Sequence, residues 1–244
     1  MTRVLITNDD GIDSPGLHAL ARMAAAQGFD VVVAAPASDT SGASASLTAV
    51  QESGRIVTTR RELPDLPDIA GYAVSASPAL IALIATRGAF GPPPDLVLSG
   101  INRGGNIGHA VLHSGTVGAA LTASAQGCPA LAVSLASEWA ADGTESHWES
   151  AATVAAGLLA EALAAPPGVV LNVNVPDLPF DKVGGVRRAT LAAFGMVQTS
   201  VEAGDGFVRM TIAEAKETPV PGTDAAALAD GYACVTPLRA ITEA

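Results

Sequence analysis

Short runs of mainly apolar residues recur along the first three quarters of the chain. They cover residues 4–7, 31–35, 96–99, 130–135 and 169–175. A parallel strand that is covered on both faces carries apolar side chains at successive positions, whereas a half-exposed strand alternates apolar and polar residues. The five runs therefore predict buried parallel strands.

Helical patterns fill the intervals between these runs. Apolar residues have helical spacing over residues 17–24, with Ser14 and Pro15 suited to the cap and first position of a helix and Gly28 to its end. Further helices are expected at residues 78–87, 116–126 and 150–164. The alternation of strands and helices predicts an α/β protein with a doubly wound, mostly parallel sheet, which binds ligands at the carboxyl ends of its strands.

Two segments depart from this alternation. Residues 55–74 are expected to form two strands around a proline-rich turn. Residues 198–203 and 207–211 flank a Gly-Asp-Gly turn at 204–206, which is a strong signal for an antiparallel hairpin. We interpret residues 1–244 as a single domain with a C-terminal extension from about residue 180.

Composition and charge narrow the possible partners. The chain has 13 Lys and Arg against 24 Asp and Glu, a net charge of -11, which disfavours binding to nucleic acids and to anionic membranes. The apolar stretch at 151–165 is interrupted by Glu161 and followed by two prolines, so we interpret it as a core helix. With two cysteines and no recognisable export signal, the chain is expected to be cytoplasmic.

The first predicted strand ends in Asn-Asp-Asp-Gly at residues 8–11. Asp9 and Asp10 repel each other when both are ionised, unless solvent, hydrogen bonds or a cation offsets the repulsion. From these residues alone, a metal site and an exposed acidic turn are both possible.

Polar loops also follow the next strands. Residues 35–44 are rich in hydroxyls and include Ser41, while Asn102 and Asn106 lie in the glycine-rich loop after the third run. Ser114, Gly115 and Thr116 open the next helix, where an N-terminus can bind phosphate or a hydroxyl can simply cap the helix. Because all these loops converge at one edge of the predicted sheet, they indicate metal-assisted phosphoryl chemistry.

In combination, these motifs resemble those of the SurE family of stationary-phase survival proteins. The similar segments, in chain order, are ITNDDGIDSPG (6–16), APASDTSGAS (35–44), LVLSGINRGGNIG (96–108), HSGTVGAA (113–120), PALAVSL (129–135), NVNVPDLP (172–179) and PGTDAAALADGYACVTPL (221–238). They extend over nearly the whole chain. The resemblance implies a Rossmann-like core, a C-terminal hairpin exchanged between subunits, and a homodimer or homotetramer.

The family resemblance also implies an activity. SurE proteins are metal-dependent phosphatases that hydrolyse nucleoside 5′- and 3′-monophosphates. By position, one Mg²⁺ or Mn²⁺ would be bound by four residues, which are Asp9, Asp10, Ser41 and Asn102. The phosphate of a nucleoside monophosphate or other small ester would be held by Asn106, Ser114, Gly115 and Thr116. The ion would polarise a phosphoryl oxygen, and Asp9 or Asp10 would help to deprotonate water.

The chain departs from the family pattern at several positions. It has His113 where relatives commonly have an aromatic residue, Thr122 where many have an acid, Ala76-Ser77-Pro78 for Gly-Thr-Pro, and Leu80-Ile81 for Asp-Cys. These changes bear on substrate preference more than on the metal ligands. His113 is either a general acid for the leaving oxygen or a partly buried packing or capping residue.

Two other functions compete with the phosphatase hypothesis. A dinucleotide-binding enzyme would need a glycine-rich phosphate fingerprint, but the first strand-to-helix turn carries NDDGIDSPG. A catalytically weak relative would keep the fold as a nucleotide-binding or structural protein. It would bind metal without turnover, although the proposed set of metal ligands is intact.

Overall fold

The computed structural model describes residues 1–137, 146–193, 197–204, 206–214 and 218–239. Its centre is a nine-stranded sheet in the order β10-β13-β9-β8-β7-β1-β2-β6-β5. Six neighbouring strands are parallel, and they are β9 (Val169–Pro176), β8 (Ala130–Ala136), β7 (Leu96–Arg103), β1 (Arg3–Thr7), β2 (Asp30–Pro36) and β6 (Ala70–Val74). At one edge of the sheet, β5 (Thr58–Arg61) pairs antiparallel with β6. At the other edge, β13 (Ala233–Arg239) pairs antiparallel with β9, and β10 (Val186–Arg188) pairs parallel with β13.

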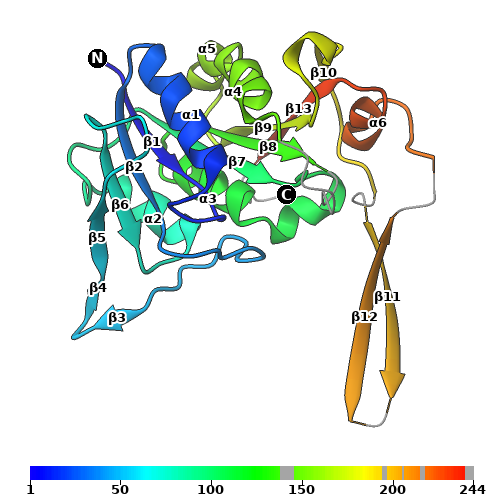
Figure 1. Ribbon diagram of the computed structural model, residues 1–244, viewed down its shortest axis with the longest axis horizontal. Coiled ribbons are helices and arrows are strands. Elements are labelled where there is room, and N and C mark those ends of the chain that lie inside the picture. Colours follow the sequence, from blue (N-terminus) through cyan, green and yellow to red (C-terminus); the bar gives the residue numbers. More distant parts are fainter. Residues whose placement is uncertain (138–145, 194–196, 205, 215–217, 240–244) are drawn as a thin grey trace.

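Helices cover both faces of the sheet (Figure 1). One core lies under α1 (Pro15–Ala26), α4 (Trp148–Ala156) and α5 (Leu159–Leu163), and the other under α2 (Pro78–Ala85) and α3 (Gly115–Ala125). Successive residues of each central strand contribute alternately to the two cores, so the strands are apolar at almost every position. This arrangement confirms the predicted doubly wound α/β fold.

Shorter elements complete the fold. They are β3 (Gln51–Glu52), β4 (Arg55–Ile56), η1 (Gly108–His113), η2 (Phe180–Lys182), β11 (Val197–Gly204), β12 (Phe207–Glu214) and α6 (Asp224–Ala229). The short 3-10 helix η1 was not expected from the sequence. The predicted 150–164 helix is divided into α4 and α5 at Gly157, a residue of low helix propensity. No helix among the described residues is long and apolar enough to cross a membrane.

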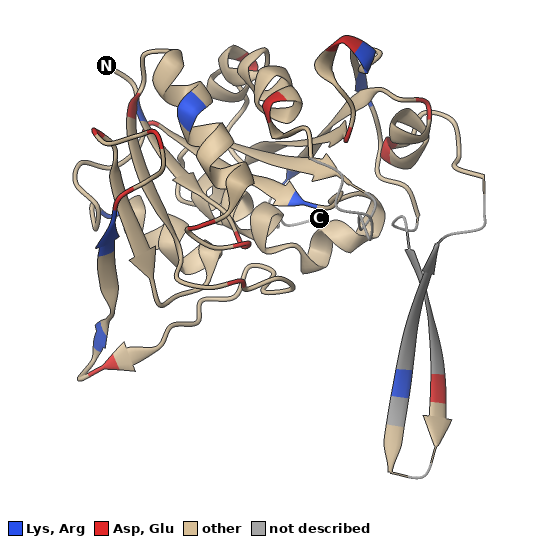
Figure 2. Ribbon diagram, viewed as in Figure 1, with Lys and Arg blue, Asp and Glu red and all other residues tan. Residues whose placement is uncertain are grey.

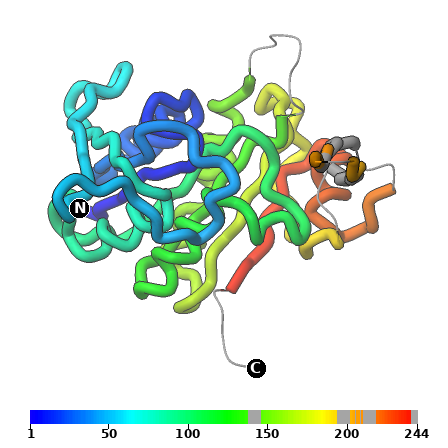
Figure 3. The backbone as a smooth tube through the Cα atoms, turned by 90° about the horizontal axis from the view of Figure 1, so that it is seen from below, coloured from blue at the N-terminus to red at the C-terminus, as the bar shows by residue number. Residues whose placement is uncertain are grey.

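The predicted C-terminal hairpin is formed by β11 and β12. Their antiparallel pairing runs from Val197↔Glu214 to Gly204↔Phe207, which leaves a two-residue loop whose first position, Asp205, lies outside the described residues. The hairpin extends away from the sheet, as Figure 1 shows from the side and Figure 3 end-on. After it, the chain returns to the sheet through α6 and β13. The interpretation as one domain with an extension from about residue 180 stays a prediction.

The position of α1 depends on a close backbone approach at Gly16. A Cβ atom at this residue would lie 2.0 Å from the carbonyl oxygen of Ile101 in β7 and 2.9 Å from the ring of Trp148. The first turn of α1 therefore lies directly against the end of β7.

We expect Gly16→Ala to lower the free energy of unfolding by about 1–3 kcal/mol or more, because the methyl group must displace backbone. Gly157→Ala is the matched control, since a Cβ there meets only Val154 O at 3.5 Å. Urea denaturation of both variants measures the difference. Equal stability of the two variants would contradict the proposed close packing.

Candidate metal and phosphate site

The two acidic residues after β1 are oriented by a tight turn. The side chain of Asn8 accepts a hydrogen bond from Gly11 N at 3.1 Å and donates one to Gly11 O at 3.1 Å. Asp9, at 3% exposure, is buried, while Asp10 is partly buried. An exposed acidic turn, one of the two alternatives that the sequence left open, is therefore excluded for Asp9.

The loop after β2 is fastened to the backbone of Asp9. Thr40 donates to Asp9 O through its backbone N at 2.8 Å and its Oγ1 at 3.1 Å. The neighbouring Ser41 is exposed and donates to Asp39 Oδ1 through its N and Oγ, at 2.7 and 2.6 Å. The loop thus places Ser41 and Asp39 at the edge where β1 ends.

Asp39 was missed as a site residue in the sequence. Its charge contributes to raising the pKa of both Asp9 and Asp10, so it belongs to the same electrostatic environment. The sequence did mark Asp39 in one way, because it is the one carboxylate in the hydroxyl-rich segment at residues 35–44. Figure 2 shows acidic positions on the loops after β1 and β2 close to each other.

The end of β7 adds Asn102 to this group. The amide nitrogen of Asn102 donates to Gly104 O at 2.7 Å and to Arg103 O at 3.2 Å, which leaves its Oδ1 as the side-chain acceptor. Arg103 N donates to Asp10 Oδ2 at 3.1 Å. The strand therefore places Asn102 directly before a residue whose backbone N–H contacts Asp10.

The N-terminus of α3 contacts Asp9 directly. A Cβ at Gly115 would lie 2.8 Å from both Cβ and Oδ2 of Asp9, so only glycine allows this approach. The hydroxyl of Thr116 donates to Asp9 Oδ1, and Ser114 caps the helix by accepting from Val117 N at 3.0 Å. Ser114 is thus a helix cap, which was one of the two roles that the sequence left open. The Asp9 carboxylate lies beside the N-terminus of a helix, a position that favours negative charge.

Asn106 follows β7 at the carboxyl edge of the sheet, and hydrogen bonds hold its backbone and side chain in place. Its backbone N donates to Asn174 Oδ1 at 2.7 Å, and its carbonyl oxygen accepts from Asn172 and Asn174 at 2.8 and 2.9 Å. Its Nδ2 donates to Ser134 Oγ at 2.8 Å. A phosphate contact through this side chain would use the second amide hydrogen.

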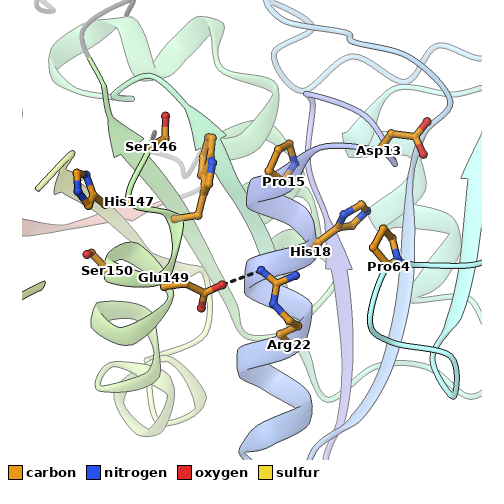
Figure 4. A pocket seen from close by; sticks show the side chains of 10 residues that line it. Asp13, Pro15, His18, Arg22, Pro64, Ser146, His147, Glu149 and Ser150 are labelled. Atoms are coloured by element: carbon orange, nitrogen blue, oxygen red, sulfur yellow. Dashed lines mark hydrogen bonds and ion pairs between the residues drawn. The ribbon is translucent and has the colours of Figure 1, made fainter. Parts of the chain in front are cut away.

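The histidines differ in their surroundings. His113 is exposed at the end of η1, so a partly buried packing role is wrong for it, and His109 is also exposed. His18 and Arg22 line a groove of about 540 Å³ between α1 and α4, with Arg22 bonded to Glu149 (Figure 4). None of the predicted metal ligands lines this groove.

The carboxylates are held in an environment that disfavours their charge. Burial raises the pKa of Asp9, although the hydrogen bond from Thr116 opposes this shift. Burial, followed by the charge of Asp9, raises the pKa of Asp10 to about 6, while the backbone N–H of Arg103 lowers it. A bound cation would relieve both effects.

The donor set suits a hard cation. Among the described residues, no group of three or more His, Cys, Asp or Glu side chains converges closely enough to hold a metal. A cation at this edge would therefore need neutral oxygens in addition to carboxylates. Asn102 Oδ1 and the Ser41 hydroxyl offer such oxygens, which suit Mg²⁺ or Mn²⁺.

The raised pKa of Asp10 predicts how the metal-free protein responds to pH. Because the folded state binds this proton more tightly than the unfolded state, the free energy of unfolding falls as pH rises from about 4 through about 6. We expect Asp10→Asn to be about 2–3 kcal/mol more stable than wild type at pH 7.5 with EDTA, and equal to it near pH 4.

Urea denaturation at several pH values in EDTA measures this difference. Asp68→Asn, which removes an exposed carboxylate from a surface loop, is the control and should follow wild type throughout. A stability gain for Asp10→Asn that does not depend on pH would show that the charge of Asp10 is not its cause.

Comparisons with known proteins identify the family of the chain. The family model for survival protein SurE matches residues 4–197. Two relatives, each named 5′/3′-nucleotidase SurE, come from Shigella dysenteriae serotype 1 and Escherichia coli O127:H6. Both are 38% identical over 244 residues, covering 97% of this chain and 90% of the relative.

A solved structure is also similar over nearly the whole chain. The SurE protein from Aquifex aeolicus matches with a TM-score of 0.79 and 30% identity, covering 97% of this chain and 93% of that one. The match of a SurE family model to most of the sequence, together with relatives similar along nearly their whole length, shows that the chain belongs to the SurE family.

Proposed function

We propose that this chain is a phosphatase that hydrolyses nucleoside 5′- and 3′-monophosphates to nucleoside and phosphate, using one divalent metal ion. The observation that carries the proposal is the contact between Asp9 and the start of α3. It puts a carboxylate suited to a cation next to a helix end suited to a phosphate. The names of the relatives agree with this activity.

Asp9, Asp10, Ser41 and Asn102 are proposed to bind Mg²⁺ or Mn²⁺. Their oxygens are contributed by the ends of β1 and β7 and by the loop after β2. When bound, the ion supplies Lewis-acid polarisation of a phosphoryl oxygen and offsets the repulsion between carboxylates. Asp39 holds Ser41 through two hydrogen bonds and so orients its hydroxyl.

The phosphate is proposed to lie at the start of α3. The backbone N–H groups of Gly115 and Thr116 face this end of the helix, and Ser114 fixes its geometry as the cap. Asn106 is proposed to contribute an amide hydrogen from the anchored loop before η1. Together these groups would stabilise the negative charge on the phosphoryl oxygens.

In the proposed reaction, water attacks phosphorus and the bond to the nucleoside oxygen breaks. Asp9 or Asp10 accepts the proton of the attacking water. The leaving oxygen takes a proton either from solvent or from His113, which is exposed near the same helix start. No covalent intermediate is required.

The assembly is proposed to be a homodimer or homotetramer formed through the hairpin. The hairpin strands β11 and β12 pair only with each other among the described strands. Phe207, at 51% exposure, lies next to the hairpin turn. A second subunit that paired with the hairpin would cover such apolar surface.

The function is tested by phosphate release from a panel of nucleoside monophosphates with Mg²⁺, Mn²⁺ or EDTA. We expect release that requires metal, and a loss of about 100-fold or more in Asp9→Asn, because a lost metal ligand removes several kcal/mol of charge stabilisation. Asp68→Asn serves as the control and should keep the wild-type rate.

Absence of release from folded wild type with every metal would overturn the proposal. Metal binding without turnover would support a catalytically weak, nucleotide-binding or structural role. Wild-type rates in Asp9→Asn would instead remove Asp9 from the proposed set of metal ligands.

A further inference from the structure

Three consecutive residues of the glycine-rich loop are anchored by parts of the chain that follow it. Asn106 is bonded to the side chains of Asn172 and Asn174 in β9 and of Ser134 in β8. Ile107, at 1% exposure, packs in a cluster with α6 and β13. Gly108 N donates to Asp224 Oδ2 at 2.8 Å. The loop is therefore held in place one residue after another.

Asn174 forms two hydrogen bonds to the backbone of one loop residue. Its Oδ1 accepts from Asn106 N at 2.7 Å, and its Nδ2 donates to Asn106 O at 2.9 Å. Asn174 is fully buried. If this contact broke, the polar groups of both residues would lose their partners without gaining water, which is costly. This side chain fixes both the position and the orientation of the Asn106 peptide groups.

Asp224 has an equally complete set of partners. Its Oδ2 accepts from Gly108 N, while its Oδ1 accepts from Ala192 N at 2.9 Å and from its neighbour Ala225 N at 2.8 Å. The carboxylate is 0% exposed. Three backbone N–H groups thus hold one buried carboxylate, which is a strong, charge-assisted arrangement.

The anchored residues lead directly to the proposed phosphate site. Gly108 begins η1, and η1 continues into the start of α3 at Gly115. Because Gly115 is in contact with Asp9, a shift of the loop would move the helix start relative to the carboxylates. Catalytic geometry tolerates such shifts poorly, since about 1 Å of misplacement can cost 100-fold.

We propose that Asn174 and Asp224 are positioning residues for phosphate binding. This inference rests on the proposed function and assigns the C-terminal part of the chain a role in the site. Neither side chain touches the substrate. They fix residues 106–108, and through them the approach of the α3 start to the metal-binding carboxylates.

The test uses Asp224→Asn and Asn174→Ala in the full-length protein. For both variants we expect kcat/KM to fall about 10- to 100-fold, with a raised KM and a raised inhibition constant for inorganic phosphate. The affinity of the substrate-free protein for Mn²⁺ should change less than about twofold, because the metal ligands lie outside residues 106–108.

Two control variants match the changes in chemistry. Asp230→Asn removes an exposed carboxylate from the other end of α6, where it bonds Arg187 and not the loop. Thr236→Val removes a buried hydroxyl from β13, opposite Asn172 in register, that has no hydrogen-bond partner among the described residues. Both controls should keep the wild-type KM and phosphate inhibition.

Hydrogen exchange provides a readout that does not depend on activity. Faster exchange across residues 104–113 is expected in Asp224→Asn and Asn174→Ala, and not in the controls. A purely structural role would lower Tm while leaving KM and phosphate inhibition unchanged at temperatures where the variants are folded, and that result would overturn the proposal. Unchanged exchange in this segment would also overturn it.

The failure of the proposed function has a different signature. A wild type that hydrolyses no monophosphate would refute that function. Calorimetric binding of inorganic phosphate and hydrogen exchange would still test whether Asn174 and Asp224 position the loop.

Discussion

The site depends on keeping the carboxylate of Asp9 buried against the N-terminus of α3. Burial, with a smaller contribution from the charge of Asp39, raises the pKa of this group, so the charged form must be stabilised from nearby. The hydroxyl of Thr116 and the partial positive charge of the helix end provide part of that stabilisation. The part of the burial cost that they do not offset would favour a bound cation, so in the proposed function the helix end and the metal stabilise the same carboxylate.

That arrangement requires close backbone packing. Gly115 allows the start of α3 to touch Asp9, and Gly16 allows the first turn of α1 to touch the end of β7. The two helices lie on opposite faces of the sheet and both begin at its carboxyl edge. The fold therefore brings loops from separate strands together at one edge of the sheet, the edge at which open α/β sheets generally bind ligands.

Much of this could be predicted from local sequence patterns. Apolar runs located β1, β2, β7, β8 and β9. The adjacent acids after β1 were compatible with a metal site or an exposed acidic turn, because adjacent like charges need solvent, hydrogen bonds or a cation. The anchoring of the loop could not be predicted in the same way. Asp224 meets Gly108 across 116 positions, and Asp39 acts on Asp9 through space. Only the asparagines in the otherwise apolar β9 gave a signal, since a buried polar side chain needs a partner.

Asp224 also connects the chain on either side of the hairpin to Gly108. Its carboxylate bonds Ala192 before the hairpin and Ala225 after it, and its backbone N bonds Thr190 O. Residues 190–192, before the hairpin, and 224–225, after it, are thus joined next to Gly108. One buried carboxylate therefore links the chain on both sides of the hairpin to Gly108 at the start of η1.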